Sequence, residues 1–211
     1  MNSPQPVIAI IAAIGSSIGN PETHGIYGWD NNLPWPRLET DVAFFKNKTT
    51  RNVVVMGRKT LISMFGPLPN RLNVVVSTTL PEGQNNWEGK DGRPFFVCSS
   101  VEKALAFARK VIPEADIFII GGEQLWKESI PYCTNLFVTH VHGDFKEFAE
   151  GSKTFPQLLD PEDSFHEHDF RVVSVRTIRD GNYRLAFAEH QKGPPIYRPE
   201  LFTASSVRTP A

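Results

Sequence analysis

The sequence contains little cysteine, no excess of charge of either sign and no long apolar run. Only Cys98 and Cys133 occur among 211 residues, each within an apolar stretch, which argues against a disulfide framework and fits a reducing compartment. With 22 basic and 23 acidic residues the net charge is −1, so the usual electrostatic argument for a nucleic-acid or membrane-surface partner is absent. No stretch approaches the roughly 20 apolar residues of a membrane span, and residues 1–6 lack the basic region of a signal peptide. We expect a cytoplasmic (cytosolic) or nuclear protein whose partner is a small molecule.

Several common site signatures are also missing. Neither G-x-G-x-x-G nor the P-loop pattern occurs, so generic nucleotide binding does not follow from them. His140-x-His142 and His166-x-His168 pair imidazoles at strand spacing, but no cysteine or carboxylate lies at a matching distance. We therefore expect surface or hydrogen-bonded histidines and no metal site. Neither cysteine is flanked by a helix start and a base, so both are expected in the core.

The chain alternates between strand and helix patterns. At 40% hydrophobic and 21% charged residues it is expected to form one globular domain over residues 7–192. Expected strands are residues 7–14, 52–56, 72–77, 95–98, 117–120 and 135–141, with a terminal hairpin at 170–178 and 183–190. Expected helices are 38–48, 58–64, 100–111 and 123–129, the third capped by Ser100. Residues 79–93 and 146–164 are expected as surface loops, and 193–211, with four prolines, as a poorly ordered tail.

The most informative residue is Asp41, which follows Leu33-Pro34-Trp35 by six positions. In the expected helix its neighbours are Leu38 at i−3, Phe44 at i+3 and Phe45 at i+4, so the carboxylate points where the phenyl rings point. A buried carboxylate needs a partner. This partner is either a ligand with convergent N–H donors or an internal arginine, unless Asp41 simply lies at a frayed helix start.

A glycine corner ends the second expected strand. Gly57 lets the chain turn sharply, and Arg58, Lys59 and Thr60 follow in the first helical turn. Free N–H groups and the helix dipole favour an anion there, which suits a phosphate. The alternative is an ordinary strand–helix corner with solvated basic residues.

A second corner carries two successive glycines, Gly121 and Gly122, after a buried strand. They allow close approach of the backbone to a ligand, or an unusual backbone conformation. Residues 15–32 form a loop longer than is usual for a compact domain, which predicts a lid. Ligands of open α/β sheets bind at the carboxyl ends of strands, so the lid and both corners are expected to face one crevice.

With these residues assembled, the chain resembles the dihydrofolate reductase family over about residues 7–192, and most of all its eukaryotic, fungal-like branch. The matching motifs are Ile10-Ile11-Ala12-Ala13, Leu33-Pro34-Trp35, Asp41 with Phe45, Val55-Met56-Gly57-Arg58-Lys59-Thr60, Pro69-Asn70-Arg71-Leu72-Asn73, Ile120-Gly121-Gly122 and Phe137-Val138-Thr139. The resemblance implies a single-domain α/β fold. This fold has an eight-stranded, mostly parallel central sheet, an antiparallel C-terminal edge hairpin, flanking helices and an adenosine-binding lobe at roughly residues 50–115.

The resemblance also implies an activity. It is the NADPH-dependent reduction of 7,8-dihydrofolate to 5,6,7,8-tetrahydrofolate, by hydride transfer to C6 and protonation at N5, in one-carbon metabolism. The enzyme would be a monomer and a target of antifolates such as methotrexate. Two alternatives stay open: a divergent folate-binding paralogue with little turnover, and a pyrimidine reductase of riboflavin synthesis, against which Asp41 argues.

Site residues follow from the same resemblance. Asp41 would pair with the pterin N3 and 2-amino group, supported by the Thr139 hydroxyl, and Arg71 would clamp the glutamate-tail carboxylate. The implied catalytic residues are Asp41, Trp35, Leu33 and Thr139. Substrate would contact Ile10, Ile11, Ala12, Asp41, Val42, Phe45, Leu68, Arg71, Ile120 and Thr139. NADPH would contact Ala12, Gly28, Gly57, Arg58, Lys59, Thr60, Ser77, Thr78, Ser100, Ile120, Gly121, Gly122, Gln124, Leu125 and Trp126, with a cis peptide joining Gly121 to Gly122.

Five positions depart from the family pattern. Val42 stands where many members have phenylalanine, and Leu61 where a tryptophan usually follows the phosphate-binding threonine. Thr78 stands where an arginine often grips the 2′-phosphate, and Trp126 where a tyrosine usually approaches the nicotinamide. Glu123 places an acid at a helix start near the expected pyrophosphate, which it would repel unless its side chain turns away.

Overall fold

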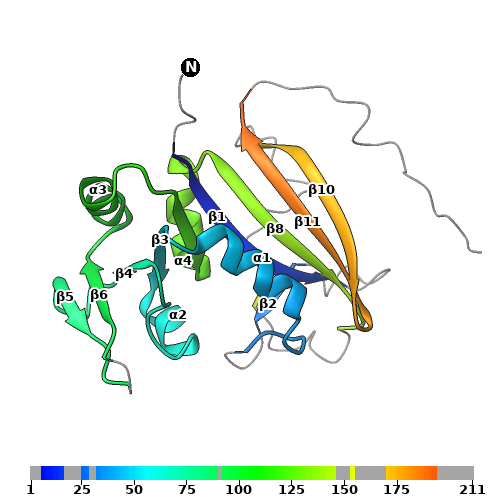
Figure 1. The fold of residues 1–211 in the computed structure, drawn as a ribbon, viewed down its shortest axis with the longest axis horizontal. Coiled ribbons are helices and arrows are strands. Elements are labelled where there is room, and N and C mark those ends of the chain that lie inside the picture. Colours follow the sequence, from blue (N-terminus) through cyan, green and yellow to red (C-terminus); the bar gives the residue numbers. More distant parts are fainter. Residues whose placement is uncertain are drawn as a thin grey trace, which may run out of the picture.

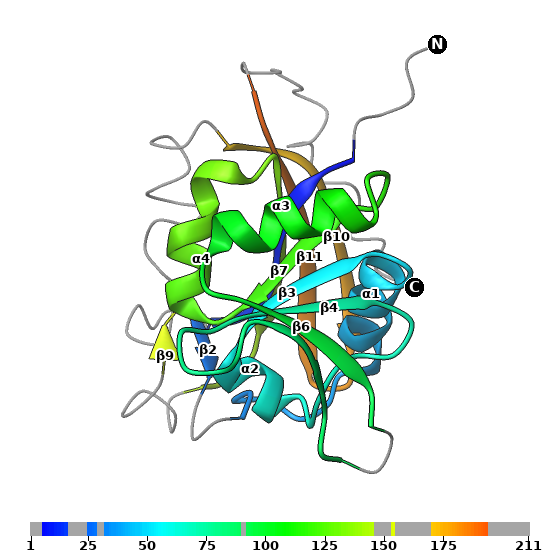
Figure 2. The ribbon, with the colours of Figure 1, turned by 90° about the vertical axis from the view of Figure 1, so that its left-hand side faces the viewer.

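The apolar runs form the centre of one sheet. The computed structural model describes residues 6–16, 25–28, 32–89, 92–145, 153–154 and 170–193. Within these residues the sheet has eleven strands in the order β10-β11-β8-β1-β7-β3-β4-β6-β5, with β2 beside β1 and β9 beside β2 (Figure 1 and Figure 2). The strands are β1 (Ile8–Ser16), β2 (Ile26–Gly28), β3 (Val53–Gly57), β4 (Leu72–Val76), β5 (Gly83–Asn86), β6 (Pro94–Cys98), β7 (Ile117–Gly121), β8 (Asn135–His142), β9 (Lys153–Thr154), β10 (Phe170–Asp180) and β11 (Tyr183–Lys192). The helices are α1 (Glu39–Thr49), α2 (Arg58–Ser63), α3 (Val101–Val111) and α4 (Glu123–Ser129), the last followed by a 3₁₀ turn, η2 (Ile130–Tyr132).

The central strands carry apolar side chains on both faces. On β3, Val53 and Val55 pack in the core cluster that contains residues of α3 and α4, whereas Val54 and Met56 pack with residues of α1 and α2. Because successive side chains of a strand point to opposite faces, a run without polar residues fits a sheet covered on both sides. Figure 2 shows α3 and α4 on one side of the sheet and α1 on the other.

The expected α/β architecture is confirmed for its long elements. All eight expected strands and all four expected helices occur, with ends within about two residues of their expected positions. The strands from β8 to β6 pair in parallel. Antiparallel pairing is found in the β10–β11 hairpin against β8 and in the short strands.

Three short strands were not expected. The expectation of a loop over residues 79–93 is wrong at β5, a polar Gly-Gln-Asn-Asn segment that pairs antiparallel with β6. Similarly, β2 and β9 lie inside the stretches expected as the lid and as a loop, and they pair with each other. Such segments are held by backbone hydrogen bonds to an edge, and backbone groups leave no hydrophobic pattern in the sequence. The rest of the 15–32 lid, at 17–24 and 29–31, and tail residues 194–211 lie outside the described residues.

The two cysteines occupy the core, as expected. Both are free and buried, and burial raises the pKa of the Cys133 thiol to about 12 and also raises that of Cys98. His140 and His142 stack on β8 with ring centroids 6.4 Å apart, while His166 and His168 lie outside the described residues. In the described ranges, no group of three or more His, Cys, Asp or Glu side chains could hold a metal ion. No helix of the described residues is long and apolar enough to cross a membrane.

A buried histidine on β11 predicts a loss of stability in acid. His190 is 1% exposed, and burial lowers its pKa from 6.5 to about 4. The unfolded chain therefore binds a proton between these two pH values while the folded protein does not, so stability falls as the pH falls through 6.5. From pH 7.5 to pH 5 this linkage is expected to cost about 2 kcal/mol. Urea unfolding of wild type and His190→Gln at both pH values measures it; an equal pH-dependent loss in both proteins would show that His190 does not contribute.

Candidate active site

The two glycine corners meet at the carboxyl ends of β3 and β7. These strands are neighbours, with Met56 opposite Gly121. A Cβ added to Gly57 would lie 3.8 Å from both Gly121 O and Gly122 N, and one added to Gly122 would lie 3.8 Å from Thr60 Oγ1. The peptide between Gly121 and Gly122 is cis, as expected. Backbone atoms of both corners thus lie close together at the carboxyl ends of two central strands, where a ligand can approach them closely. We call Gly57, Gly121 and Gly122 the glycine cradle.

Two cationic residues lie beside the glycine cradle, at the start of α2. Gly57 is the N-cap, Arg58 and Lys59 are exposed and Thr60 is half-buried. The first turn of α2 carries no acidic side chain. Two cations beside the free N–H groups of a helix start form an environment that favours phosphate oxygens.

The acid at the start of α4, Glu123, has partners of its own. The Glu123 carboxylate accepts a 2.6 Å hydrogen bond from Lys127 Nζ. Burial, followed by the charge of Glu123, raises the pKa of Tyr27 to about 12. The Tyr27 ring makes an edge contact with Trp126 at 5.0 Å between centroids. Glu123 is therefore balanced by Lys127 and next to Tyr27, which removes much of the expected repulsion of a pyrophosphate.

Of the other α4 residues expected at the cofactor, one is exposed and two are buried. Gln124 Nε2 donates to Glu128 Oε1 at 2.7 Å, and the side chains of Leu125 and Trp126 are buried in the core. Gly28, at the end of β2, is also buried and pairs with β9.

Three further residues expected at the cofactor follow β4 and β6: Ser77 and Thr78 come after β4, and Ser100 comes after β6. The Ser77 hydroxyl is buried and accepts from the N–H groups of Thr79 and Leu80, both at 3.2 Å. Thr78 is exposed. Ser100 caps α3 as expected, accepting from Lys103 N at 3.3 Å. Both serine hydroxyls therefore have roles in local structure.

Asp41 lies half-buried in the first turn of α1. It forms a hydrogen bond with the hydroxyl of Thr139, a β8 residue that is 2% exposed. Burial raises the pKa of the Asp41 carboxyl, the bond with Thr139 lowers it, and the charge of Asp180 raises it again. No arginine pairs with Asp41 within the described part of the chain. The described residues thus give no support to the internal-arginine alternative. The helix-start alternative holds in part, since Asp41 lies in the first turn of α1, where the helix dipole eases the burial of a carboxylate.

The motif before α1 splits between core and surface. Trp35 is 6% exposed and packs with Phe145 at 5.8 Å between ring centroids, whereas Leu33 is 50% exposed. Leu38, the N-cap of α1, is buried in the same cluster as Trp35. Burial of Trp35 and Leu38 thus fixes the segment that leads into α1, the helix that carries Asp41.

Arg71 lies at the far end of α1. Its Nε donates to Thr49 Oγ1 at 2.9 Å and its Nη1 to the Pro69 carbonyl at 2.7 Å, and its guanidinium carbon lies 5.8 Å from the centroid of the Phe45 ring. Leu68 is held by Asn73, which receives the Leu68 N–H at 2.8 Å and donates to its carbonyl at 2.9 Å. Asp41 and Phe45 lie on α1, and Arg71 contacts its last turn from the segment before β4, so the acid and the cation are near opposite ends of the helix.

The residues expected from β1 divide between the two faces of the sheet. Ile11 and Ile120 pack in the cluster that includes Phe45, whereas Ile10 and Ala12 pack on the side of α3 and α4. Adjacent residues of a strand point to opposite faces, so the side chains of Ile10 and Ile11 lie on opposite faces of the sheet. Val42 is half-buried on α1 next to Asp41.

Sequence reasoning missed two residues beside the site. Tyr27 lies in the region expected as a lid, and Asp180 occupies an Arg-Asp-Gly-Asn turn that by itself is typical of a hairpin. No local pattern signals that either side chain reaches α1 or α4.

Comparison with known proteins agrees with this arrangement. Residues 11–189 match the family described as "Dihydrofolate reductase". The dihydrofolate reductase of Bacillus subtilis (strain 168) is 36% identical over 153 residues, which cover 72% of this chain and 77% of the relative. That of Staphylococcus haemolyticus is 32% identical over 156 residues, 74% of this chain and 80% of the relative.

A solved structure is also similar. It is the dihydrofolate reductase from Enterococcus faecalis complexed with NADP(H) and RAB-propyl, with a TM-score of 0.67 and 29% sequence identity, over 90% of this chain and 98% of that chain. These relatives are bacterial and do not support the expected fungal-like branch. The matched segment, the sheet order and the paired glycine corners together show that the chain belongs to the dihydrofolate reductase family.

Proposed function

We propose that the protein is an NADPH-dependent dihydrofolate reductase in which Asp41 binds and orients the pterin. The observation that carries this proposal is the half-buried Asp41 carboxyl, which has a raised pKa and a bond with Thr139. A carboxylate that burial has made costly gains most from a ligand with two adjacent N–H donors. The N3 and 2-amino groups of a pterin offer such a pair.

The same residue would influence the proton step. Reduction of dihydrofolate adds a hydride to C6 and a proton to N5, and protonation at N5 makes C6 more electrophilic. Asp41 would hold the pterin in the tautomer that accepts this proton, while Thr139 keeps the carboxylate oriented. The buried Trp35 would form a wall that limits the water reaching the ring.

The cofactor side fits the glycine cradle. Bound NADPH supplies the hydride. Arg58, Lys59 and Thr60 would hold its phosphates, and the backbone at Gly57 and Gly121 leaves room for close approach. Since Thr78 carries no charge, Arg58 would be the main partner of the 2′-phosphate.

Further features of the enzyme are proposed on narrower grounds. The adenosine-binding lobe would comprise roughly residues 50–115, which hold β3 to α3. The free, buried cysteines fit the cytoplasm. The monomeric state and the fungal-like branch rest on the motif resemblance alone.

A direct assay tests the proposal. Mixing protein, NADPH and dihydrofolate is expected to give a steady loss of NADPH absorbance that requires both small molecules. Tight binding of methotrexate without turnover would instead support a folate-binding paralogue. Turnover of a riboflavin-pathway pyrimidine with none of dihydrofolate would support a pyrimidine reductase.

Arg71→Leu is expected to weaken substrate binding rather than chemistry. The glutamate tail is remote from C6, so the loss of a charge-assisted contact should raise KM for dihydrofolate by roughly 10- to 100-fold with a smaller change in kcat. Steady-state kinetics with dihydrofolate and with a pterin that lacks the tail make the comparison. The tail-less pterin should be indifferent to the change; equal losses for both substrates would mean that the bonds of Arg71 to Thr49 and Pro69 are its whole role.

A further inference from the structure

The turn between β10 and β11 reaches across to the first turn of α1. Asp180 Oδ2 accepts a hydrogen bond from the backbone N–H of Thr40 at 2.9 Å, although the two residues are 140 positions apart. The N-cap residue of α1, Leu38, forms no capping bond with its own side chain. The first turn of a helix has N–H groups without intrahelical partners, so Asp180 supplies from a distant turn the acceptor that a local cap would provide.

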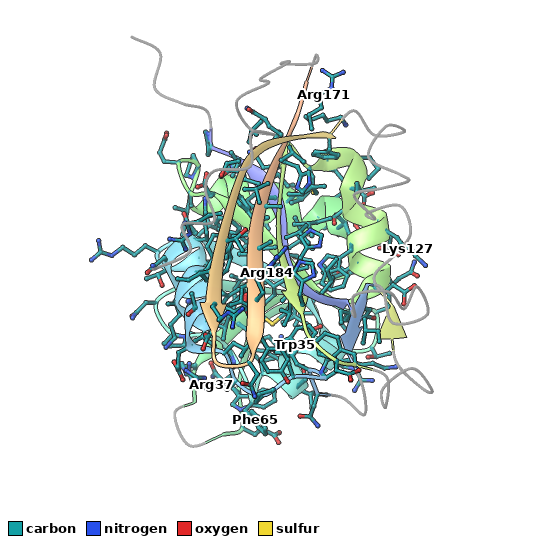
Figure 3. All side chains as sticks on the ribbon, turned by 90° about the vertical axis from the view of Figure 1, so that its right-hand side faces the viewer. Trp35, Arg37, Phe65, Lys127, Arg171 and Arg184 are labelled. Atoms are coloured by element: carbon teal, nitrogen blue, oxygen red, sulfur yellow. The ribbon has the colours of Figure 1, made fainter. Side chains whose placement is uncertain are left out.

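The same turn is tied to the other side of the site. Tyr183, opposite Asp180 in the hairpin register, stacks with Phe145 at 6.1 Å between centroids and 20° between planes. Phe145 in turn contacts the ring of Trp35. A Cβ at Gly143 would lie 2.7 Å from Tyr183 Cε1, so the ring is closely enclosed. Figure 3 views this hairpin with Trp35 and Arg37 labelled near its turn.

Within the described residues, Asp180 is the charged residue that acts on Asp41, whereas two charged residues of α1 are paired elsewhere. On the same helix, Glu39 is paired with Arg37 at 2.6 Å, and Lys48 is paired with Glu189 of β11 at 3.6 Å. From β8, the group that faces Asp41 is the neutral hydroxyl of Thr139. From the hairpin turn it is the Asp180 carboxylate, whose negative charge adds to burial in raising the pKa of Asp41.

We propose that Asp180 is a positioning residue of the reductase site, which caps α1 from the hairpin turn and so sets both the placement and the charge environment of Asp41. The hairpin turn contacts two parts of the site: Asp180 binds the helix that carries Asp41, and Tyr183 packs on Phe145, which packs on Trp35. This inference rests on the proposed role of Asp41 in binding the pterin.

Two variants separate the cap from the charge. Asp180→Asn keeps an oxygen that can accept from Thr40 N–H but removes the negative charge, whereas Asp180→Ala removes both. Asn182→Ala, at an exposed position of the same turn, is the matched control. The readouts are the pH profile of kcat/KM, the carbon-13 titration of the Asp41 carboxyl in the free protein, amide exchange at Thr40, and Tm.

The expected results differ between the variants. In Asp180→Asn the Asp41 pKa should move to lower pH by roughly 0.5 unit, and the acidic limb of the kcat/KM profile, where the carboxylate is lost, should move with it. Tm should stay near that of wild type. In Asp180→Ala, Tm should drop by about 3 °C, the Thr40 amide should exchange faster, and kcat/KM should fall about tenfold. Asn182→Ala should match wild type throughout.

The proposal is overturned if Asp180→Asn leaves the Asp41 titration unchanged, or if Asp180→Ala leaves Thr40 exchange unchanged. Should Asp180→Ala fail to fold, the Asp180→Asn titration still decides the charge effect. The titration and the amide exchange need no turnover. If wild type fails to reduce dihydrofolate, the proposed function fails, while these two readouts still test whether Asp180 caps α1 and shifts the titration of Asp41.

Discussion

Replacing Asp41 with asparagine is expected to leave the fold intact and to lower turnover of dihydrofolate by about 100- to 1,000-fold at neutral pH. The amide has nearly the same shape, but it presents one acceptor oxygen and one N–H₂ donor where the pterin offers two donors. It also removes the negative charge that favours protonation of the ring. The loss should shrink in acid, where dihydrofolate takes its proton from solvent.

Steady-state kinetics of Asp41→Asn between pH 5 and pH 8 measure this effect. Glu39→Gln is the matched control, because Glu39 lies in the same helical turn but is exposed and paired with Arg37. It should keep wild-type rates over the whole range. A wild-type rate for Asp41→Asn at neutral pH would contradict the assignment of this residue.

A methyl group at Gly121 is expected to cost both stability and cofactor affinity. Gly121 has φ +124°, a conformation that residues with a side chain rarely adopt, and an added Cβ would lie 3.1 Å from Trp126 Cζ2 and 3.6 Å from Thr60 Oγ1. Gly121→Ala should lower the free energy of unfolding by about 3 kcal/mol, since backbone strain and a tight contact act together. The displaced corner should raise the Kd for NADPH more than about tenfold.

Gly83→Ala separates these two causes. Gly83 has φ +101° and nothing within 4 Å of an added Cβ, so it reports backbone strain without the contact. It should lose about 1 kcal/mol of stability and keep the wild-type Kd for NADPH. Urea unfolding and fluorescence titration with NADPH provide both quantities. Equal results for the two variants would show that the contacts of the Gly121 corner have no part in cofactor binding.

The sequence by itself determined the elements whose signals are local. Unbroken apolar runs predicted the central strands because a sheet covered on both faces needs apolar side chains at every position. Glycine after β3 and β7 predicted the two corners, and Ser100 predicted the cap of α3. In each case the physical cause lies in a few consecutive residues, so the element can be predicted from the sequence alone.

Only the tertiary structure decided which of these residues work together. It separated Ile10 from Ile11 by the faces of the sheet, paired the polar strand β5 with an edge, and turned Glu123 toward Lys127. It also brought Asp180 to Thr40 across 140 positions. A contact at that separation depends on the relative placement of α1 and the β10–β11 hairpin, which is set by the packing of the whole sheet and leaves no periodic trace in either segment.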